Sequence, residues 1–218
     1  MKKIITMLGL LATCSIGTAA LYTADFSNAG EGLTHSTGTP PPAGPHTVSG
    51  TNWELSYATA PSTDSSGNQF ITVGGVMSVL DWGGDGTITS DPILVTSDGT
   101  VDITGAAVAV GGDVFNSVGT EGITWFYKIN TDPVVSIYYG ETELGGPVAG
   151  GTDIGNLFDD IAVSSGDTLL VGFTVNVNGG GDGADISSLE VELTPVPEPS
   201  SAALLGLGGL ALILRRRK

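Results

Sequence analysis

Residues 169–177 read LLVGFTVNV, and every second side chain from Leu169 to Val177 is apolar, with Gly172, Thr174 and Asn176 between them. Successive side chains of a β-strand point to opposite faces, so this stretch predicts a strand with one buried and one solvent-facing side. Residues 123–129 read ITWFYKI and alternate in the same way. Clean alternation of this kind is typical of antiparallel sheets that face water on one side.

Similar short runs, separated by Gly, Asp, Asn, Ser and Thr, fill the chain from residue 21 to residue 195. No helical period of useful length interrupts them, apart from a short turn expected at 154–161. About nine or ten strands without helices between them predict an all-β fold, a two-sheet antiparallel β-sandwich of the jelly-roll type. We expect loops at 33–50 and 178–183, and strands at 53–58, 69–73, 76–81, 93–96, 100–104, 123–130, 134–139, 168–177 and 187–193.

The charge of the chain is distributed unevenly. Residues 21–195 contain 22 acidic residues and one basic residue, Lys128, for a formal net charge of −21, whereas the other six basic residues lie at the two ends. Phosphate contacts need Lys and Arg, so this body is not expected to bind nucleic acid or an anionic lipid surface. Self-repulsion at this charge is relieved by salt or by bound cations.

The first twenty residues have the three parts of a secretory signal peptide. Lys2 and Lys3 form the positive start, residues 4–12 are apolar, and residues 17–20 are small. The apolar run is shorter than the roughly 20 residues that span a bilayer, which predicts an N-terminal signal helix removed after Ala20. The alternative is a lipoprotein signal in which Cys14 is lipidated. Either way, the chain is expected to be exported.

The last 25 residues differ from the body in composition. Prolines surround Glu198, residues 201–214 are mostly apolar, and residues 215–218 are all basic. A helix of this apolar stretch would rise only about 21 Å against a hydrocarbon core of about 30 Å. It is therefore expected to act as a short C-terminal transmembrane helix that anchors the chain for a limited time, with the basic residues in the cytoplasm.

This tail resembles the PEP-CTERM sorting signal of Gram-negative bacteria. The resemblance implies that an exosortase recognises Pro197, Glu198 and Pro199, that the apolar helix crosses the inner membrane transiently, and that the protein then reaches the cell surface or extracellular matrix. Together with the patterns of the first twenty residues and of the body, it divides the chain into three expected segments: a signal peptide at 1–20, a β-sandwich domain at 21–193 and a sorting signal at 194–218. The alternative is an ordinary tail anchor with a chance Pro-Glu-Pro. The stop-transfer residues would be Arg215, Arg216, Arg217 and Lys218.

The body also resembles, in pattern only, the concanavalin-like and carbohydrate-binding-module jelly rolls of secreted bacterial proteins. The likeness rests on an early strand with Trp53, a central aromatic strand at 123–130, and a last strand that follows Asp185. It would cover most of residues 22–193. A likeness of fold class implies the architecture and leaves the function open.

Catalytic patterns are weak in this sequence. His35 and His46 lie 11 residues apart, without the further ligands at tight spacing that a zinc site needs. Neither a Gly-x-Ser-x-Gly turn nor the carboxylate pattern of the concanavalin-like glucanases is found. The sequence therefore predicts a protein that is not an enzyme.

Calcium is the cofactor that the loops suit best. Ca²⁺ is bound by six to eight oxygen atoms, which flexible Asp- and Gly-rich loops supply. Asp81 and Asp85 flank one such stretch, and Asp182 and Asp185 lie in another. These four carboxylates are candidate calcium ligands, although neither stretch matches an EF-hand loop. The alternative is that Asp and Gly at these positions only form turns.

Two functions remain open for the body. The first is a non-catalytic structural or adhesive role at the cell surface. The alternative is a carbohydrate-binding module that holds exopolysaccharide, with Ca²⁺ as a possible aid. Trp53 and Trp125 lie in predicted strands and are expected in the core, whereas Trp82 lies among glycines and acids and is the candidate glycan contact. The expected partners are the secretion machinery, the exosortase and exopolysaccharide.

Overall fold

A computed structural model of the chain describes residues 18–34, 46–57, 69–80, 84–111, 121–140, 152–177 and 182–196, together with 208, 209, 214 and 215. These residues are almost entirely β-structure. The strands are β1 Ala19–Thr23, β2 Gly32–Thr34, β3 His46–Ser49, β4 Trp53–Tyr57, β5 Gln69–Val73, β6 Val76–Leu80, β7 Gly84–Ser90, β8 Ile93–Leu94, β9 Gly99–Gly111, β10 Gly122–Ile129, β11 Val135–Tyr139, β12 Thr152–Val163, β13 Thr168–Val177 and β14 Asp182–Pro195.

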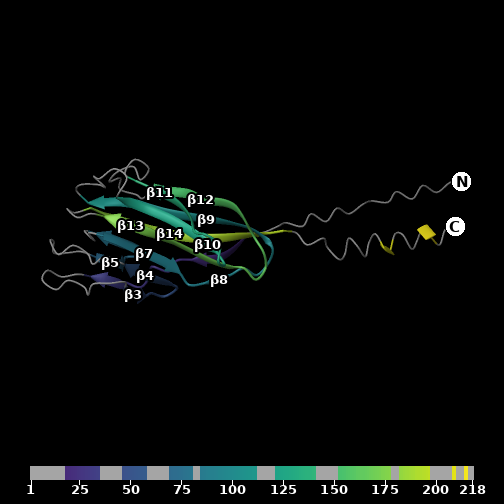
Figure 1. Cartoon of the computed structure of the whole chain (residues 1–218), viewed down its shortest axis with the longest axis horizontal. Coiled ribbons are helices and arrows are strands. Elements are labelled where there is room, and N and C mark those ends of the chain that lie inside the picture. Colours follow the sequence, from purple (N-terminus) through teal and green to yellow (C-terminus); the bar gives the residue numbers. More distant parts are fainter. Residues whose placement is uncertain are drawn as a thin grey trace.

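The strands form two antiparallel sheets. In the first, sheet A, the order is β12-β9-β14-β6-β5-β2, and β1 also pairs with β14. In the second, sheet B, the order is β11-β10-β13-β7-β4-β3, and β8 also pairs with β13. Figure 1 shows β11 and β12 on one side of the molecule and β3 and β4 on the other. The predicted all-β fold with two antiparallel sheets is confirmed, whereas its assignment to the jelly-roll type stays a prediction.

Most predicted strands are confirmed, and the differences have physical causes. The short turn expected at 154–161 is wrong, because these residues belong to strand β12. Its pairing with β9 shifts register three times, and Asp160 has a φ of 52°. Bulges of this kind break the period of two that marks a strand in a sequence. The structure also adds β1, β2, β3 and β7, which the sequence did not predict as strands.

Two segments expected as loops are partly strands. The expected loop at 33–50 contains the end of β2 and all of β3. The glycine-rich segment after residue 177 gives way to strand at Asp182, because β14 pairs there with β9 and, from Gly183, with β6. Neighbouring strands on both sides supply the hydrogen bonds that hold these polar residues in extended form.

The two predicted helices lie largely outside the described residues. The predicted signal peptide covers residues 1–20, of which only 18–20 are described, and Ala19 and Ala20 begin strand β1. Of the predicted C-terminal helix and its basic residues, 201–218, the structure describes positions 208, 209, 214 and 215, which are helical. Within the described part of the chain, the longest apolar helical stretch falls short of what a membrane crossing needs.

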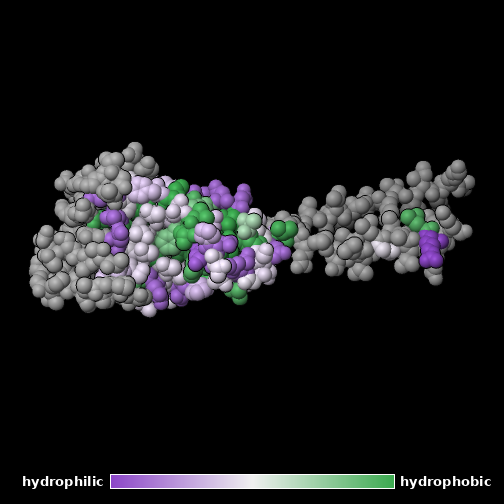
Figure 2. Space-filling model, viewed as in Figure 1, coloured by the Kyte–Doolittle hydropathy of each residue, from purple (hydrophilic) through white to green (hydrophobic). Residues whose placement is uncertain are grey.

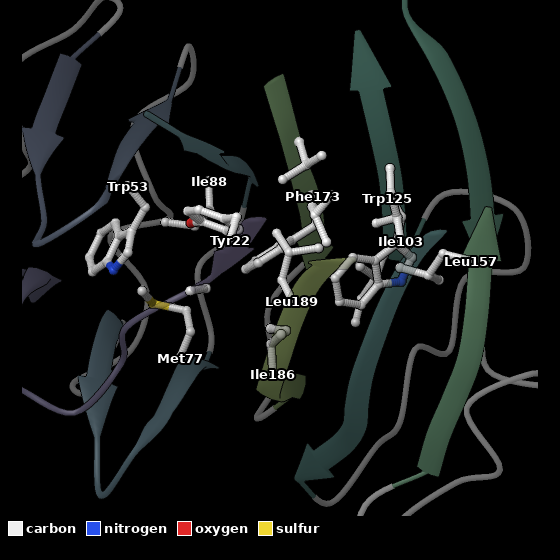
Figure 3. Packing of buried hydrophobic residues seen from close by; sticks show 14 of the residues in the cluster. Tyr22, Trp53, Met77, Ile88, Ile103, Trp125, Leu157, Phe173, Ile186 and Leu189 are labelled. Carbon is white, nitrogen blue, oxygen red and sulfur yellow. The ribbon is translucent and has the colours of Figure 1, made fainter. Parts of the chain in front are cut away.

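One hydrophobic core lies between the two sheets. In β13 the side chains of Val171, Phe173 and Val175 are fully buried, as the alternation in this strand predicts. Trp53 and Met77 lie at one end of the core and Trp125, Ile103 and Leu157 at the other, as Figure 3 shows. Burial of large side chains from both sheets is what holds the layers together.

The sheets come close where an aromatic ring of one faces a glycine of the other. A Cβ atom at Gly86 of sheet B would lie 2.2 Å from the Phe70 ring of sheet A. A Cβ atom at Gly105 of sheet A would lie 3.0 Å from the Trp125 ring of sheet B. Each large ring therefore fills the space that a missing side chain leaves on the opposite sheet, which is how large and small residues interdigitate in a dense core.

The two buried tryptophans differ in their hydrogen bonding. The indole Nε1 of Trp53 donates to the backbone oxygen of Asp25 at 2.9 Å. The Nε1 of Trp125 has no hydrogen-bond partner among the described residues, although the side chain is fully buried. Its ring packs against Phe173 with the centroids 5.1 Å apart. A buried donor without a partner costs free energy, so Trp125 contributes through packing alone.

Candidate functional site

Both ends of the body lie at one end of the sandwich, which we call the proximal end. Ala19 of β1 is in register with Leu193 of β14, and Gly99 of β9 is in register with Pro195. The backbone N–H of Val196 still donates to the oxygen of Asp98 at 2.9 Å. The backbone hydrogen bonding therefore extends to Val196, the residue before the predicted recognition motif, Pro197–Pro199, which lies outside the described residues.

The proximal end is closed by turns that hydrogen bonds tie to one another. Asp167 accepts hydrogen bonds from the backbone N–H of Ser164 at 2.8 Å and from the side-chain amide of Asn130 at 2.7 Å. The backbone N–H of Ser165 donates to the carboxylate of Asp98 at 2.8 Å. Three turns that are far apart in sequence thus form one rigid cap beside the point where the tail leaves.

We expect Asp167 to make this cap sensitive to acid. Hydrogen bonds from the Ser164 backbone and the Asn130 side chain lower the pKa of Asp167 below its ordinary value. A carboxyl with a lowered pKa in the folded state stabilises the fold above its unfolded pKa and loses that contribution as the pH falls through the folded pKa. The melting temperature of Asp167→Asn should therefore fall less between pH 5 and pH 2 than that of the unchanged protein. Equal pH profiles for the two proteins would contradict this role.

The four candidate calcium ligands do not form one site. Asp85 lies in β7 on the outer face of sheet B, opposite Asn176, and Asp185 lies in β14 on the outer face of sheet A, between Ser78 and Val108. Asp182 begins β14, and Asp81 falls outside the described residues. Within the described ranges no three His, Cys, Asp or Glu side chains are arranged to hold a metal ion. Calcium binding stays a prediction.

The remaining candidate residues are described only in part. Trp82, the candidate glycan contact, lies outside the described residues, between the end of β6 at Leu80 and the start of β7 at Gly84. The stop-transfer residues are described only at Arg215, which is exposed. These assignments stay predictions.

The outer face of sheet B carries a row of hydroxyl groups that the sequence analysis did not identify. Thr124 of β10, Thr174 of β13, Thr87 of β7 and Ser56 of β4 lie in register on four adjacent strands. All four are half-buried, and their neighbours along each strand point into the core. The hydroxyl groups of Thr87 and Thr174 are hydrogen-bonded at 2.9 Å. We call these four residues the hydroxyl row.

Two aromatic rings stand on the same face, each against a glycine of sheet B. A Cβ atom at Gly172 would lie 2.6 Å from the ring of Phe126. Tyr138 of β11 is in register with Thr124 at the end of the hydroxyl row, and a Cβ atom at Gly122 would lie 2.9 Å from its ring. The Tyr138 hydroxyl donates to the backbone oxygen of Glu121, and 43% of the residue is exposed. Glycines thus make room for both rings close to the sheet.

The outer face of sheet A carries several acidic residues on neighbouring strands. Asp102 of β9 is in register with Glu192 of β14, and Glu190 is in register with Thr104. The carboxylate of Asp102 also accepts a hydrogen bond from the backbone N–H of Asp160 at 2.8 Å. Like charges opposite each other in a sheet repel. Figure 2 shows hydrophobic and hydrophilic residues interspersed over the described part of the visible face of the body.

The hydroxyl row could have been predicted from the sequence only if the pairing register of β4, β7, β10 and β13 had been known. Its members come from four strands and are separated by up to 118 positions in the chain, between Ser56 and Thr174. Threonine on a solvent-facing strand position is common because it suits a strand. Only the pairing of neighbouring strands places the four hydroxyl groups on one line.

Comparison with known proteins identifies the tail. Residues 195–218 match the family model of the PEP-CTERM protein-sorting motif. A search of curated proteins finds no match for the chain. The motif marks an exported protein of a Gram-negative bacterium that is anchored in the membrane as a precursor and processed by an exosortase. The chain therefore ends in a PEP-CTERM sorting motif that begins at the last residue of strand β14.

Proposed function

We propose that the exported body is a non-catalytic β-sandwich with an adhesive role at the cell surface or in the extracellular matrix. The observation that carries this proposal is the position of the sorting motif, which begins at Pro195 where the last strand ends. Processing within the tail would leave both sheets intact. The sorted product would then be the folded sandwich, held at its proximal end while it is anchored.

The outer face of sheet B supports a binding role. It presents hydroxyl groups and rings in fixed positions, which suits attachment to a surface or polymer. This observation also favours the alternative function, carbohydrate binding.

The sorting step is tested with two glutamate variants in an exosortase-bearing Gram-negative host. Glu198→Ala removes the charged residue of the motif, whereas Glu192→Ala removes an exposed glutamate of β14 six positions earlier. We expect Glu192→Ala to be exported and processed normally, and Glu198→Ala to keep its tail and stay in the membrane fraction. Mass spectrometry and cell fractionation measure both. Normal processing of Glu198→Ala would contradict the assigned role of the motif.

The adhesive role is tested by exchanging the body. A chain in which residues 21–195 are replaced by an unrelated exported domain keeps both sorting ends and differs only in its cargo. We expect cells that export this chimera to lose cell-to-cell or matrix adhesion relative to cells that export the natural protein at equal surface amounts. Unchanged adhesion would show that the body has another role.

A further inference from the structure

We propose that the last residues of the sandwich control how fast the exosortase reaches the sorting motif. Residues 194–196, which we call the end segment, are held against β9 in sheet A, and they must leave the sheet before the enzyme can bind Pro197–Pro199. The inference rests on the sorting role of the tail and does not depend on the adhesive role of the body.

The motif follows directly after the last hydrogen bond of the body. Pro195 is in register with Gly99 of β9, and the backbone N–H of Val196 donates to the carbonyl oxygen of Asp98 at 2.9 Å. Pro197 is the next residue, about 3.8 Å further along the chain. Enzymes that recognise a peptide motif bind it in extended form through its main-chain groups and those of its neighbours. In the folded body the neighbours on one side, the end segment, are already paired with β9.

The connection between the body and the predicted membrane helix is short. Only residues 197–200 lie between Val196 and the apolar stretch that begins at residue 201. Four residues span at most roughly 14 Å when fully extended. A precursor anchored by its tail therefore presents the motif close to both the folded sandwich and the bilayer, which leaves the enzyme little room.

The end segment can be released without opening the core. Leu193, the residue before it, is 2% exposed and belongs to the core. Thr194 and Pro195 are half-buried, and Val196 is 60% exposed. Pro195 has no N–H group to donate, so few hydrogen bonds hold the segment. Strand ends with few buried contacts open locally at a low free energy, and opening as far as Leu193 frees about 10 Å of chain before the motif.

The cap at the proximal end sets how firmly the end segment is held. The Asp98 carboxylate accepts a hydrogen bond from the Ser165 backbone at 2.8 Å, and the Ser165 hydroxyl donates to the Thr96 carbonyl at 3.2 Å. The turn that carries the acceptor for Val196 is thus fixed by a second turn. When opening and closing are fast relative to cleavage, the rate of processing follows the fraction of molecules in which the segment is open. The sandwich thereby sets how long the precursor stays anchored.

The first test compares two glycine variants of the anchored precursor in an exosortase-bearing Gram-negative host. A Cβ atom at Gly99 would lie 2.3 Å from the backbone oxygen of Thr194, so Gly99→Ala pushes the end segment away from β9. A Cβ atom at Gly183 would lie 2.4 Å from the backbone oxygen of Val79, so Gly183→Ala disturbs β14 at its other end as a matched control. Pulse-chase labelling measures how fast each precursor loses its tail.

We expect Gly99→Ala to be processed about threefold faster or more, and Gly183→Ala to be processed at the natural rate. The melting temperatures of the processed proteins check that both variants fold. Equal acceleration of both variants would mean that overall stability governs processing, and no acceleration of Gly99→Ala would mean that the folded end is not limiting. Either result would overturn the proposal.

The second test leaves the sandwich unchanged. An insertion of about eight Gly and Ser residues between Val196 and Pro197 adds roughly 16 Å of free chain before the motif. We expect this precursor to be processed at least as fast as Gly99→Ala, and Gly99→Ala to add nothing to its rate. The same insertion between Gly74 and Gly75, in the turn from β5 to β6 where a Cβ atom would meet nothing within 4 Å, should leave processing unchanged. Unchanged or slower processing of the tail insertion, or equal acceleration by the control insertion, would overturn the proposal.

Glu198→Ala separates this inference from the sorting role of the motif. If Glu198→Ala blocks processing with and without the tail insertion, and the insertion alone speeds processing, both hold. If Glu198→Ala blocks processing in both chains but the insertion leaves the rate unchanged, the motif is right and the control by the end segment is wrong. If Glu198→Ala is processed normally, the assigned role of the motif fails, and this inference fails with it.

Discussion

Truncation of Trp125 to alanine is expected to lower the free energy of unfolding by about 3–5 kcal/mol. The side chain is fully buried, packs against Phe173, and fills the space over Gly105 on the opposite sheet. Removal of such a ring leaves a cavity between two sheets whose strands are held by their ladders and cannot collapse into it. Urea unfolding of the exported protein measures the loss.

Phenylalanine variants of the two buried tryptophans form the matched control. Trp53→Phe and Trp125→Phe remove the same atoms from equally buried sites, but only Trp53 loses a hydrogen bond, to the Asp25 carbonyl. We expect Trp53→Phe to be the more destabilising variant by about 1–2 kcal/mol, because it leaves a partly buried acceptor without its donor. If Trp125→Phe proves equally costly or costlier, its indole N–H contributes in a way that the described contacts do not explain.

Replacement of Gly86 by valine is expected to destabilise the protein by about 3 kcal/mol, in the upper part of the range for overpacked cores. A Cβ atom at this position of β7 would lie 2.2 Å from the ring of Phe70, which is itself fully buried on the opposite sheet. The ring has no free space to move into, so the two sheets must separate locally. Thermal unfolding of the exported protein measures the effect.

Two further variants show whether the cause is the contact between the sheets. Thr89→Val lies on the same strand with its side chain on the outer face, and a surface change of this kind usually alters stability by about 0.5 kcal/mol or less. Phe70→Ala combined with Gly86→Val should cost clearly less than the sum of the two single variants, because one creates the space that the other needs. Strict additivity would mean that the cost of Gly86→Val arises within β7.

The strands that were predictable from the sequence are those with one face fully in the core. In β13 buried positions alternate with half-buried ones over most of the strand, and in β10 they do so from Ile123 to Phe126, so a period of two is visible in the residue types. β12 has bulges at three places, and β7 has Ile88 as its one large apolar residue among glycine, aspartate, threonine and serine, so neither shows that period. Both strands exist because neighbours pair with them, which is information from distant parts of the chain.

The candidate sites likewise differ in how far the sequence alone predicts them. The sorting motif is contiguous, so its presence at residues 195–218 could be predicted from the sequence alone. The hydroxyl row is assembled from β4, β7, β10 and β13, and the register that aligns Thr124 with Thr174 and Thr87 is a property of the folded sheet. A sequence shows which residues face outward in a strand, but not which strands stand side by side.

The pairing of β14 has a mechanical consequence for a protein held by its tail. β14 is hydrogen-bonded to β9 along its whole length, and β1 and β6 pair with its other edge. Tension applied through residue 196 runs along the axis of this strand, so it loads many hydrogen bonds in shear at once and does not peel them open one after another. An edge strand such as β3, pulled sideways, would unzip at a far lower force. The last strand of the sandwich is thus built as a tether, able to carry load for as long as the tail remains anchored.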